Sequence, residues 1–320
     1  MNKAHFFSKK LTLIRHVFFG IILLNQACYA EEKRTIKDAY GENISVPANP
    51  QRIVTLSEID LDSLLALSVK PIGTVNGRGQ TTLPGYLLDK TDSSLTIVGD
   101  LNRPNIEKVI ELEPDLILTG PDRPEVLALL NEIAPTVVTF QYGEPWKKVF
   151  QRSADIINHQ DAAKLFLQHY DETILQTKEY LANVQGQTLS IVRWNPKGPS
   201  YMYSDSFASL IVEEVGLKRP DYQQDPGHTH SRPLSLEALH LLDGDWLVVG
   251  TLSPDGEAVD AMRQAQSTPA FTRLNAIQGK RYDAVDGSLW TSVGGPLAAL
   301  EVINDLKRIL SKPDALPLNP

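Results

Sequence analysis

The chain has 320 residues, of which 42% are hydrophobic and 22% charged, and its formal net charge is −8 at pH 7. This length allows about two domains with substantial cores. The acidic balance and the lack of a basic stripe interleaved with aromatic residues exclude nucleic acid as an expected partner. The chain has 1 cysteine, so disulfide frameworks and cysteine metal clusters are excluded as well.

Residues 1–30 have the pattern of a secretory signal peptide. Basic residues precede the apolar run 17–24, and a small-residue end resembling a leader-peptidase site leads to Glu31. The apolar run is too short to anchor the chain across a bilayer. Cleavage after Ala30 would remove Cys28, leaving a free periplasmic protein without thiol chemistry. The alternative is a lipoprotein acylated at Cys28, which we disfavour because Asn25 stands where a lipobox has an aliphatic residue.

The N-terminal lobe, residues 31–158, alternates strand and helix patterns. A hairpin is predicted at 35–50, and short apolar runs then alternate with helical spacing of apolar residues. The main predictions are strands at 53–56, 71–75, 95–99 and 136–140 and helices at 59–67 and 125–133. This order is typical of an α/β lobe with a largely parallel sheet.

Residues 146–184 contain almost no helix breaker. The pattern predicts one helix around 149–157 and a longer one that begins with Asp161 as its cap. The longer helix would run about 23 residues, or roughly 35 Å at 1.5 Å per residue. Because that length matches the diameter of a domain, residues 159–185 are predicted to form a rigid connecting helix between two lobes.

The C-terminal lobe, residues 186–311, repeats the strand and helix order. It is predicted to contain a strand at 190–194, a helix at 207–215, a strand at 284–286 and a closing amphipathic helix at 296–310. Residues 312–320 are rich in proline and are predicted to be a flexible tail.

One pattern of residues occurs in both lobes. Residues 105–120 read NIEKVIELEPDLILTG, and residues 235–250 read SLEALHLLDGDWLVVG. The two segments align with each other without a gap. Each copy predicts a short helix followed by a buried strand, with Asn105 or Ser235 as the N-cap. Two homologous α/β units within one chain are the simplest explanation.

Several short motifs occur in the order seen in a known family. They are Pro50-Gln51-Arg52-Ile53-Val54, Val98-Gly99, Pro104-Asn105-Ile106-Glu107, Glu113-Pro114-Asp115-Leu116-Ile117, Ser235-Leu236-Glu237 and Gly294-Gly295-Pro296-Leu297. Together they resemble the helical-backbone periplasmic binding proteins of iron–siderophore and vitamin B12 ABC importers, over essentially the whole mature chain. The resemblance implies two Rossmann-like α/β lobes joined by a single long backbone helix, a class III periplasmic binding protein-like fold.

The same resemblance implies a function without catalysis. The protein would capture a ferric siderophore between its lobes and deliver it, as a monomer, to the permease dimer of an ABC importer. Iron(III) would be held by the oxygens of the chelator, so neither a cofactor nor a protein metal ligand is expected. An exported hydrolase or metalloenzyme is disfavoured, because the sequence has no Gly-x-Ser-x-Gly and no His-Glu-x-x-His motif.

Two other ligands stay open. Haem or a corrinoid is the first, because Tyr201, Met202 or Tyr203 could supply an axial ligand to haem. Direct binding of a metal ion is the second, because His228 and His230 lie one residue apart in an exposed loop. Further ligands at suitable spacing are not evident, so a metal site is the less favoured reading.

The resemblance also implies that one surface glutamate on each lobe docks against arginines of the permease. The matching positions are Glu107 and Glu237, the third residue of each repeat copy. A carboxylate can accept bidentate bonds from arginine, and a two-fold partner needs equivalent anchors on both lobes. The alternative is that each glutamate is a solvated residue favoured by the helix dipole.

Ligands of open α/β sheets bind beyond the carboxyl ends of the strands. The loops at these positions carry arginines on both sides of the predicted cleft, and planar guanidinium groups suit the carboxylates of charged ferric chelates. The predicted ligand-binding residues are Arg103, Arg193, Trp290, Arg78, Arg232, Tyr203 and Trp194. Each has a structural alternative, because loop arginines are usually solvated and tryptophans usually lie in the core.

Overall fold

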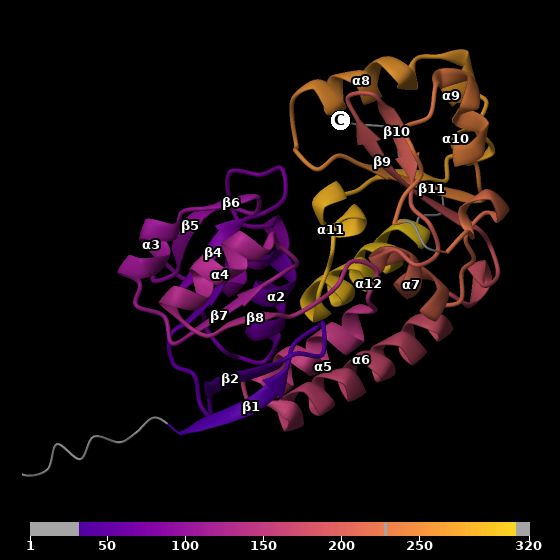
Figure 1. Cartoon of the computed structure of the whole chain (residues 1–320). Helices are drawn as coiled ribbons and strands as arrows, with labels where there is room; N and C mark the ends of the chain where they lie inside the picture. The colour runs from indigo at the N-terminus through magenta and orange to yellow at the C-terminus, as the bar shows by residue number, and fades with distance from the viewer. Residues whose placement is uncertain (1–31, 227–228, 312–320) are drawn as a thin grey trace, which may run out of the picture.

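Two sheets, one in each lobe, organise the chain in this computed structural model, which describes residues 32–226 and 229–311 (Figure 1). The predicted signal peptide at 1–30, with Cys28, lies outside the described residues, as do His228 and the predicted tail at 312–320. Among the described residues, no helix is long and apolar enough to cross a membrane.

The N-terminal lobe is built on a six-stranded sheet. In spatial order its strands are β6 (Arg103–Pro104), β5 (Thr96–Asp100), β4 (Gly73–Asn76), β3 (Ile53–Thr55), β7 (Leu116–Thr119) and β8 (Thr136–Val138). All neighbouring strands run parallel except β5 and β6, which form an antiparallel edge. The predicted hairpin is present as β1 (Lys33–Lys37) and β2 (Asn43–Pro47). The largely parallel sheet that the alternation predicted is confirmed.

Three α-helices and one 3₁₀-helix accompany this sheet. They are α2 (Glu58–Ala66), η1 (Gly85–Lys90), α3 (Ile106–Glu111) and α4 (Pro124–Ile133). Helix α2 starts at Ser57, whose hydroxyl accepts a hydrogen bond of 3.2 Å from the amide of Asp60. Its first turns are buried although they carry Glu58, Asp60 and Asp62. Three buried carboxylates on one helix need specific partners, because an unpaired buried charge is costly.

The C-terminal lobe repeats part of the topology of the first. Its sheet has the order β10 (Gly198–Tyr201), β9 (Leu189–Asn195), β11 (Trp246–Gly250) and β12 (Tyr282–Ala284). The parallel series β9, β11, β12 corresponds to β3, β7, β8 of the first lobe. Strand β10 is antiparallel, because it follows β9 through a turn of only Pro196 and Lys197. The duplication seen in the sequence thus extends to the order of the strands.

Short helices surround the second sheet. They are α7 (Phe207–Glu214), η3 (Asp221–Gln223), η4 (Leu236–Leu242), α8 (Glu257–Gln266), α9 (Pro269–Thr272), α10 (Asn275–Gln278) and α11 (Gly287–Thr291). The two repeat copies differ here. The Asn105 side chain accepts a 3.0 Å bond from the Lys108 amide and caps α3, whereas the copy at 235–250 forms the 3₁₀-helix η4 and Ser235 makes no side-chain cap bond. The prediction of Ser235 as an N-cap acceptor was therefore wrong.

The lobes are joined by helices that run beneath both of them (Figure 1). Helix α5 (Trp146–Ile156) leads to α6 (Gln160–Tyr180), whose 21 residues give about 32 Å at 1.5 Å per residue. The short η2 (Ala182–Val184) follows. The N-cap position of α6 is His159 and not Asp161, which lies in the first turn, so the predicted cap residue was wrong. One hydrophobic cluster contains residues of both sheets and of these helices, so the lobes share a core.

The closing helix α12 (Pro296–Leu310) matches the predicted segment and contacts α2, α6 and α7. Its start is fixed to the first lobe by Asp62, which accepts bonds of 2.7 and 2.9 Å from the amides of Leu297 and Ala298. The Tyr86 hydroxyl donates a third bond of 2.9 Å to the same carboxylate. A Cβ at position 295 would lie 2.6 Å from Asp62 Cγ, so this contact requires Gly295. The chain therefore crosses between the lobes a second time.

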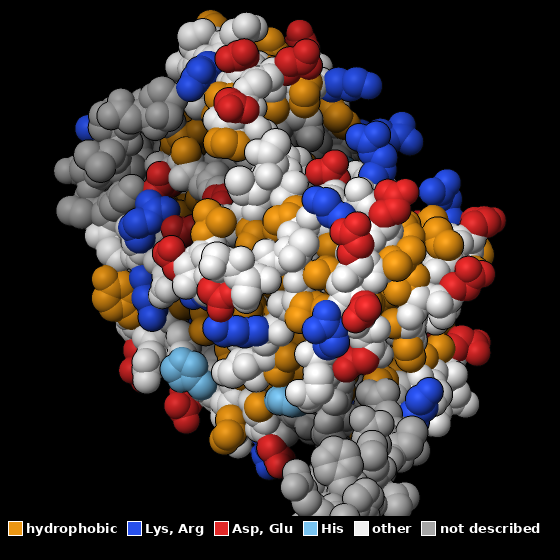
Figure 2. Space-filling model, turned by 90° about the vertical axis from the view of Figure 1, so that its left-hand side faces the viewer, with side chains coloured by type: hydrophobic (Ala, Val, Ile, Leu, Met, Phe, Trp, Pro, Cys, Tyr) orange, Lys and Arg blue, Asp and Glu red, His pale blue; other side chains and the backbone are white. Residues whose placement is uncertain are grey.

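Figure 2 shows the surface of the molecule from the side of the N-terminal lobe. Basic and acidic side chains are interspersed there with apolar ones, and the described residues of this face carry no basic stripe.

Candidate functional site

Two adjoining hollows lie between the lobes. Both are lined by Ile59, Arg78, Tyr142 and Val293. They hold about 680 and 710 Å³ of space, including the part open to solvent, and small-molecule sites typically measure ~300–1,000 Å³. The first hollow also receives residues of the C-terminal lobe, and the second is otherwise lined mainly by loops of the N-terminal lobe. We call the two together the cleft.

The cleft is formed largely where strands of the N-terminal sheet end. Ser57 and Glu58 follow β3, Arg78 follows β4, Asn102 follows β5, and Gly120 follows β7. This is the edge at which ligands of open α/β sheets bind. The topology thus brings together polar groups that are far apart in the sequence.

Arg193 reaches the first hollow from strand β9 of the C-terminal lobe. The residue is only 6% exposed, and its Nε atom has no hydrogen-bond partner among the described residues. Burial lowers the pKa of Arg193, and the positive charge of Arg78 lowers it further. A buried polar atom without a hydrogen-bond partner is unfavourable. The protein therefore presents a cation that an anionic ligand could neutralise.

Glu58 and Ser292 connect the two lobes at the base of the cleft. The backbone amide of Arg78 donates a bond of 2.5 Å to Glu58 Oε1, and the Ser292 hydroxyl donates one of 3.0 Å to Oε2. Burial raises the pKa of Glu58, although both hydrogen bonds and the positive charge of Arg78 oppose the shift. Because Ser292 lies in the segment that leads to α12, this carboxylate ties the first lobe to the second crossing of the chain.

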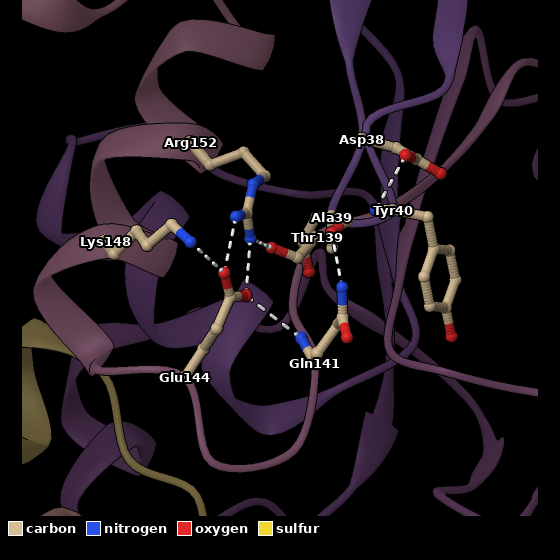
Figure 3. Close-up of polar contacts among 8 residues, drawn as sticks. All are labelled: Asp38, Ala39, Tyr40, Thr139, Gln141, Glu144, Lys148 and Arg152. Carbon is tan, nitrogen blue, oxygen red and sulfur yellow. Dashed lines mark hydrogen bonds and ion pairs between the residues drawn. The ribbon is translucent and has the colours of Figure 1, made fainter.

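One rim of the cleft is a loop held by an ion-pair network (Figure 3). Glu144 Oε1 lies 2.7 Å from an Arg152 nitrogen and 2.8 Å from Lys148 Nζ, and Oε2 accepts a second bond of 2.8 Å from Arg152. The bonds from Arg152 are the main reason that the pKa of Glu144 falls to about 2. Glu144 stays ionised at neutral pH, so the network fixes residues 139–145.

Two of the predicted ligand-binding residues lie in the cleft, and two others lie in the core instead. Arg193 and Arg78 line the first hollow from opposite lobes. Trp290 is fully buried, and its Nε1 donates a bond of 2.9 Å to Asp305 of α12. Trp194 is buried in an edge-to-face contact with Phe271, with ring centroids 6.4 Å apart. Neither ring reaches the cleft. Both tryptophans are core residues, which is the structural alternative to ligand contact.

The remaining predicted residues lie near the cleft but not in its lining. Arg103 and Arg232 are exposed. Arg103 lies between the lining residues Asn102 and Pro104, and Arg232 follows the buried Ser231. Tyr203 is half-buried and packs edge-to-face on Tyr201 at 5.3 Å. Their contact with a ligand stays a prediction.

Tyr142, Trp146 and Ser292 are among the lining residues that did not enter the prediction. Tyr142 follows the predicted strand at 136–140, so the rule of carboxyl ends could have found it if it had been applied to this strand. Trp146 is buried and lies in the first turn of α5, where apolar spacing indicates only a core residue. Ser292 had no sequence signal, because its place depends on how the chain returns to the first lobe.

The two glutamates predicted to dock a permease occupy equivalent positions. Glu107 and Glu237 are exposed in the first turns of α3 and η4. A hydrogen bond with the Ser235 side chain lowers the pKa of Glu237. Both side chains are thus open to a partner.

The described residues contain no group of three or more His, Cys, Asp and Glu side chains that could hold a metal ion. His230 lines the first hollow, and its Nδ1 lies 2.8 Å from the carbonyl oxygen of Ser231. Met202 lines the same hollow, whereas Tyr201 and Tyr203 do not. His228, the other half of the predicted histidine pair, lies outside the described residues.

Comparison with known proteins agrees with this architecture. A family model described as periplasmic binding protein matches residues 53–284, which is more than half of the chain. The chain belongs to the periplasmic binding protein family. Members of this family are substrate-binding proteins, and the ligand of the chain is accordingly expected in the cleft between the lobes.

Three relatives of this periplasmic binding protein are informative. A probable siderophore-binding lipoprotein of Bacillus subtilis, YfiY, is 31% identical over 95% of this chain and 99% of its own. The Fe(3+) dicitrate-binding periplasmic protein FecB of Escherichia coli is 26% identical over 93% of this chain and 96% of its own. The crystal structure of SirA of Staphylococcus aureus with staphyloferrin B matches with a TM-score of 0.76 and 26% identity, over 87% of this chain and 98% of that one.

Proposed function

We propose that this periplasmic binding protein captures an anionic ferric siderophore in its cleft and hands it to an ABC importer for iron uptake. The observation that carries the proposal is Arg193, a buried arginine whose Nε atom has no hydrogen-bond partner among the described residues, in a hollow that Arg78 also lines. The siderophore and ferric citrate ligands named for the relatives support the ferric chelate as the substrate class.

The arginines account for recognition without a metal site in the protein. A guanidinium is planar, stays charged and matches the geometry of a carboxylate, so it can bind the outer oxygens of an iron chelate. The chelator supplies the oxygens that iron(III) requires. Binding, and not a chemical step, is then the whole task of the cleft, and we propose that the protein is not an enzyme.

Glu107 and Glu237 are the proposed contacts with the permease dimer. They are exposed on the first turn of equivalent helices, one on each lobe, as a two-fold partner requires. We further propose that residues 1–30 direct export and that the mature protein is a free periplasmic monomer. The relatives include both a lipoprotein and a periplasmic protein, so mass spectrometry of the mature N-terminus decides between cleavage at Ala30 and acylation of Cys28.

Isothermal titration calorimetry of the mature chain tests the ligand class. Ferric citrate, ferric staphyloferrin B, a neutral ferric tris-hydroxamate and a ferric tris-catecholate are titrated separately, each beside its iron-free form. We expect saturable binding of a carboxylate-bearing ferric chelate at submicromolar concentration and much weaker binding of the neutral hydroxamate. A preference for the neutral chelate would contradict the role given to the arginines.

Haemin, cobalamin and free metal ions complete the panel. Met202 and His230 line the first hollow, so haem is the alternative that the lining residues could ligate directly. Binding of haemin or cobalamin alone would replace the ferric chelate with that ligand. Binding of a bare metal ion alone would replace the siderophore receptor with a metal receptor.

A further inference from the structure

We infer that Tyr142 is a fixed aromatic contact for the bound chelate and that it selects chelates with a planar, unsaturated arm. The inference deepens the proposed function and rests on it. Tyr142 lines both hollows of the cleft, together with Ile59, Arg78 and Val293. A ligand seated across the two hollows therefore meets this side chain.

The side chain of Tyr142 is largely exposed, although its neighbours are buried or hydrogen-bonded. The residue is 65% exposed, whereas Phe140, two positions earlier, is 4% exposed and packs with Ile59 and Val149. The Tyr142 ring stands edge-on to Phe140, with centroids 5.9 Å apart and planes at 83°. Much of the remaining ring surface is open to solvent. An exposed aromatic ring supplies contact area at low entropic cost when a ligand covers it.

Hydrogen bonds of the neighbouring Gln141 and Glu144, which Figure 3 draws, hold the backbone on both sides of Tyr142. Before it, the Gln141 side chain donates a bond of 2.6 Å to the carbonyl oxygen of Ala39 in the N-terminal hairpin. After it, Glu144 accepts a bond of 3.1 Å from the Gln141 amide and two bonds from Arg152. Arg152 also donates a bond of 2.6 Å to the carbonyl oxygen of Thr139. The Glu144 and Arg152 pair is thus a positioning device for the ring.

Gly143 completes the turn. Its φ of +86° is in the left-handed region, and no atom lies within 4 Å of a Cβ built at this position. The glycine is therefore required by the backbone and not by lack of space. The turn is thus held by the hydrogen bonds of Gln141, Glu144 and Arg152 and by the backbone conformation of Gly143. It is suited to presenting an aromatic ring at one place on the rim.

Ring geometry indicates the kind of ligand. Offset stacking and edge-to-face contact favour a flat, unsaturated group over a branched aliphatic one. Arg78 and Arg193 lie in the same hollow, so the negative charge of the chelate and its planar arm would be recognised side by side. Tyr142 then determines which anionic chelates bind well, whereas the arginines determine that the ligand is an anion.

The test compares Tyr142→Ala and Tyr142→Phe with Tyr222→Ala. Tyr222 is a matched control, because it is 63% exposed and lines neither hollow of the cleft. Calorimetric titrations use ferric citrate, which has no aryl arm, and a ferric chelate with carboxylate and catecholate groups. We expect Tyr142→Ala to raise the Kd for the aryl chelate at least tenfold and for ferric citrate less than threefold. Tyr222→Ala should leave both values unchanged, and Tyr142→Phe, which keeps the ring, should restore most of the affinity for the aryl chelate that Tyr142→Ala loses.

A double-mutant cycle tests the positioning role of Glu144. Glu144→Gln alone should weaken binding of the aryl chelate several-fold, but it should have no further effect in the Tyr142→Ala background, because the ring it positions is absent. Additive losses would assign Glu144 a general structural role and overturn that part of the inference.

The outcomes separate the inference from the proposed function. If the wild-type chain binds a ferric chelate and Tyr142→Ala binds it equally well, the inference about Tyr142 fails and the proposed function stands. If the wild-type chain binds no ferric chelate, the proposed function fails and the inference fails with it. Equal losses for both chelates would overturn the selection of planar arms.

Discussion

Arg193 and Arg78 line one hollow from opposite lobes, so that the positive charge of each arginine acts on the other. Glu144 and Asp205 also line this hollow, but Glu144 is already held by Arg152 and Lys148. Arg193 is the more buried arginine and the one for which the structure gives no compensation among the described residues. A binding site that keeps an unpaired cation sacrifices stability for affinity.

The first prediction follows from this arrangement. Arg193→Met should raise the free energy of unfolding of the unliganded protein by about 1–3 kcal/mol, because it removes a buried polar group that has no partner. Urea denaturation at neutral pH measures the change.

Arg219→Met is the control for this prediction. Arg219 is also buried in the same lobe, and its Nε atom likewise has no partner among the described residues. Its two terminal nitrogens, however, donate to the carbonyl oxygens of Leu189 and Met202 and to Gln223 Oε1. Its replacement should lower the free energy of unfolding by about 3 kcal/mol or more, because those acceptors lose their donor. Similar losses of stability for both variants would show that Arg193 has a structural role.

The second prediction concerns two buried carboxylates on α2. Burial raises the pKa of Asp60 and of Asp62 from 3.8 to about 6. The Asp60 carboxylate accepts bonds of 2.5 Å from the hydroxyls of Ser57 and Thr139, which can rotate to accept instead. Asp62 accepts from backbone amides, which can only donate. Asp60→Asn should therefore change stability at pH 7.5 by less than about 1 kcal/mol, and Asp62→Asn should cost about 1–3 kcal/mol.

The pH dependence of stability follows from the same pKa values. The folded pKa exceeds the unfolded one, so the folded chain holds a proton that the unfolded chain releases. Each group stabilises the fold below about pH 4, and this contribution is lost as the pH rises through about 6. Two pKa units correspond to roughly 3 kcal/mol per group. Urea titrations between pH 4 and 7.5 should show a shallower decline for Asp60→Asn than for the wild type; an unchanged slope would mean that Asp60 is ionised throughout.

The third prediction concerns Trp290. Trp290→Phe should lower the free energy of unfolding by about 1–3 kcal/mol, because it removes the bond to Asp305 and leaves a void in the core. The Kd for the ferric chelate should stay within a factor of two of the wild-type value, because the ring does not line the cleft. A tenfold loss of affinity without loss of stability would restore Trp290 to the binding site.

The fourth prediction concerns Glu107 and Glu237. Replacement of both by alanine should leave chelate affinity unchanged and should abolish iron uptake in cells that depend on this protein, because the permease loses an anchor on each lobe. Glu111→Ala is the matched control, because Glu111 is exposed on the same helix α3 but is not duplicated in η4. Normal uptake by the double variant would contradict the docking role.

Local signals predicted the elements of the fold well. The bounds of α12 were predicted to the residue, and α2, α4 and α7 agree closely, because each is rich in apolar residues and has a clear break at its end. The pattern of the second repeat copy did not indicate that it would form a 3₁₀-helix and not an α-helix. Its apolar residues are spaced as in α3, but η4 closes with 3₁₀ geometry and without a side-chain cap from Ser235.

The site was only partly predictable from the sequence. Arg193 and Arg78 could be placed by the rule of carboxyl strand ends, since that rule depends on strand order alone. Trp290 and Trp194 obey the same rule in sequence, but whether a side chain turns to the cleft or to the core depends on the packing of α12 and of Phe271. Ser292 depends on the second crossing between the lobes, which no local pattern encodes.

The most direct test is a paired calorimetric titration of wild type and Arg193→Met with ferric staphyloferrin B and with its iron-free form. We predict saturable, submicromolar binding of the ferric form by the wild type, at least a tenfold higher Kd for Arg193→Met, and an unfolding midpoint for this variant that is no lower than that of the wild type. Equal affinity of the two proteins for the ferric chelate, or binding that does not require iron, would contradict the proposal that Arg193 holds an anionic ferric siderophore in the cleft.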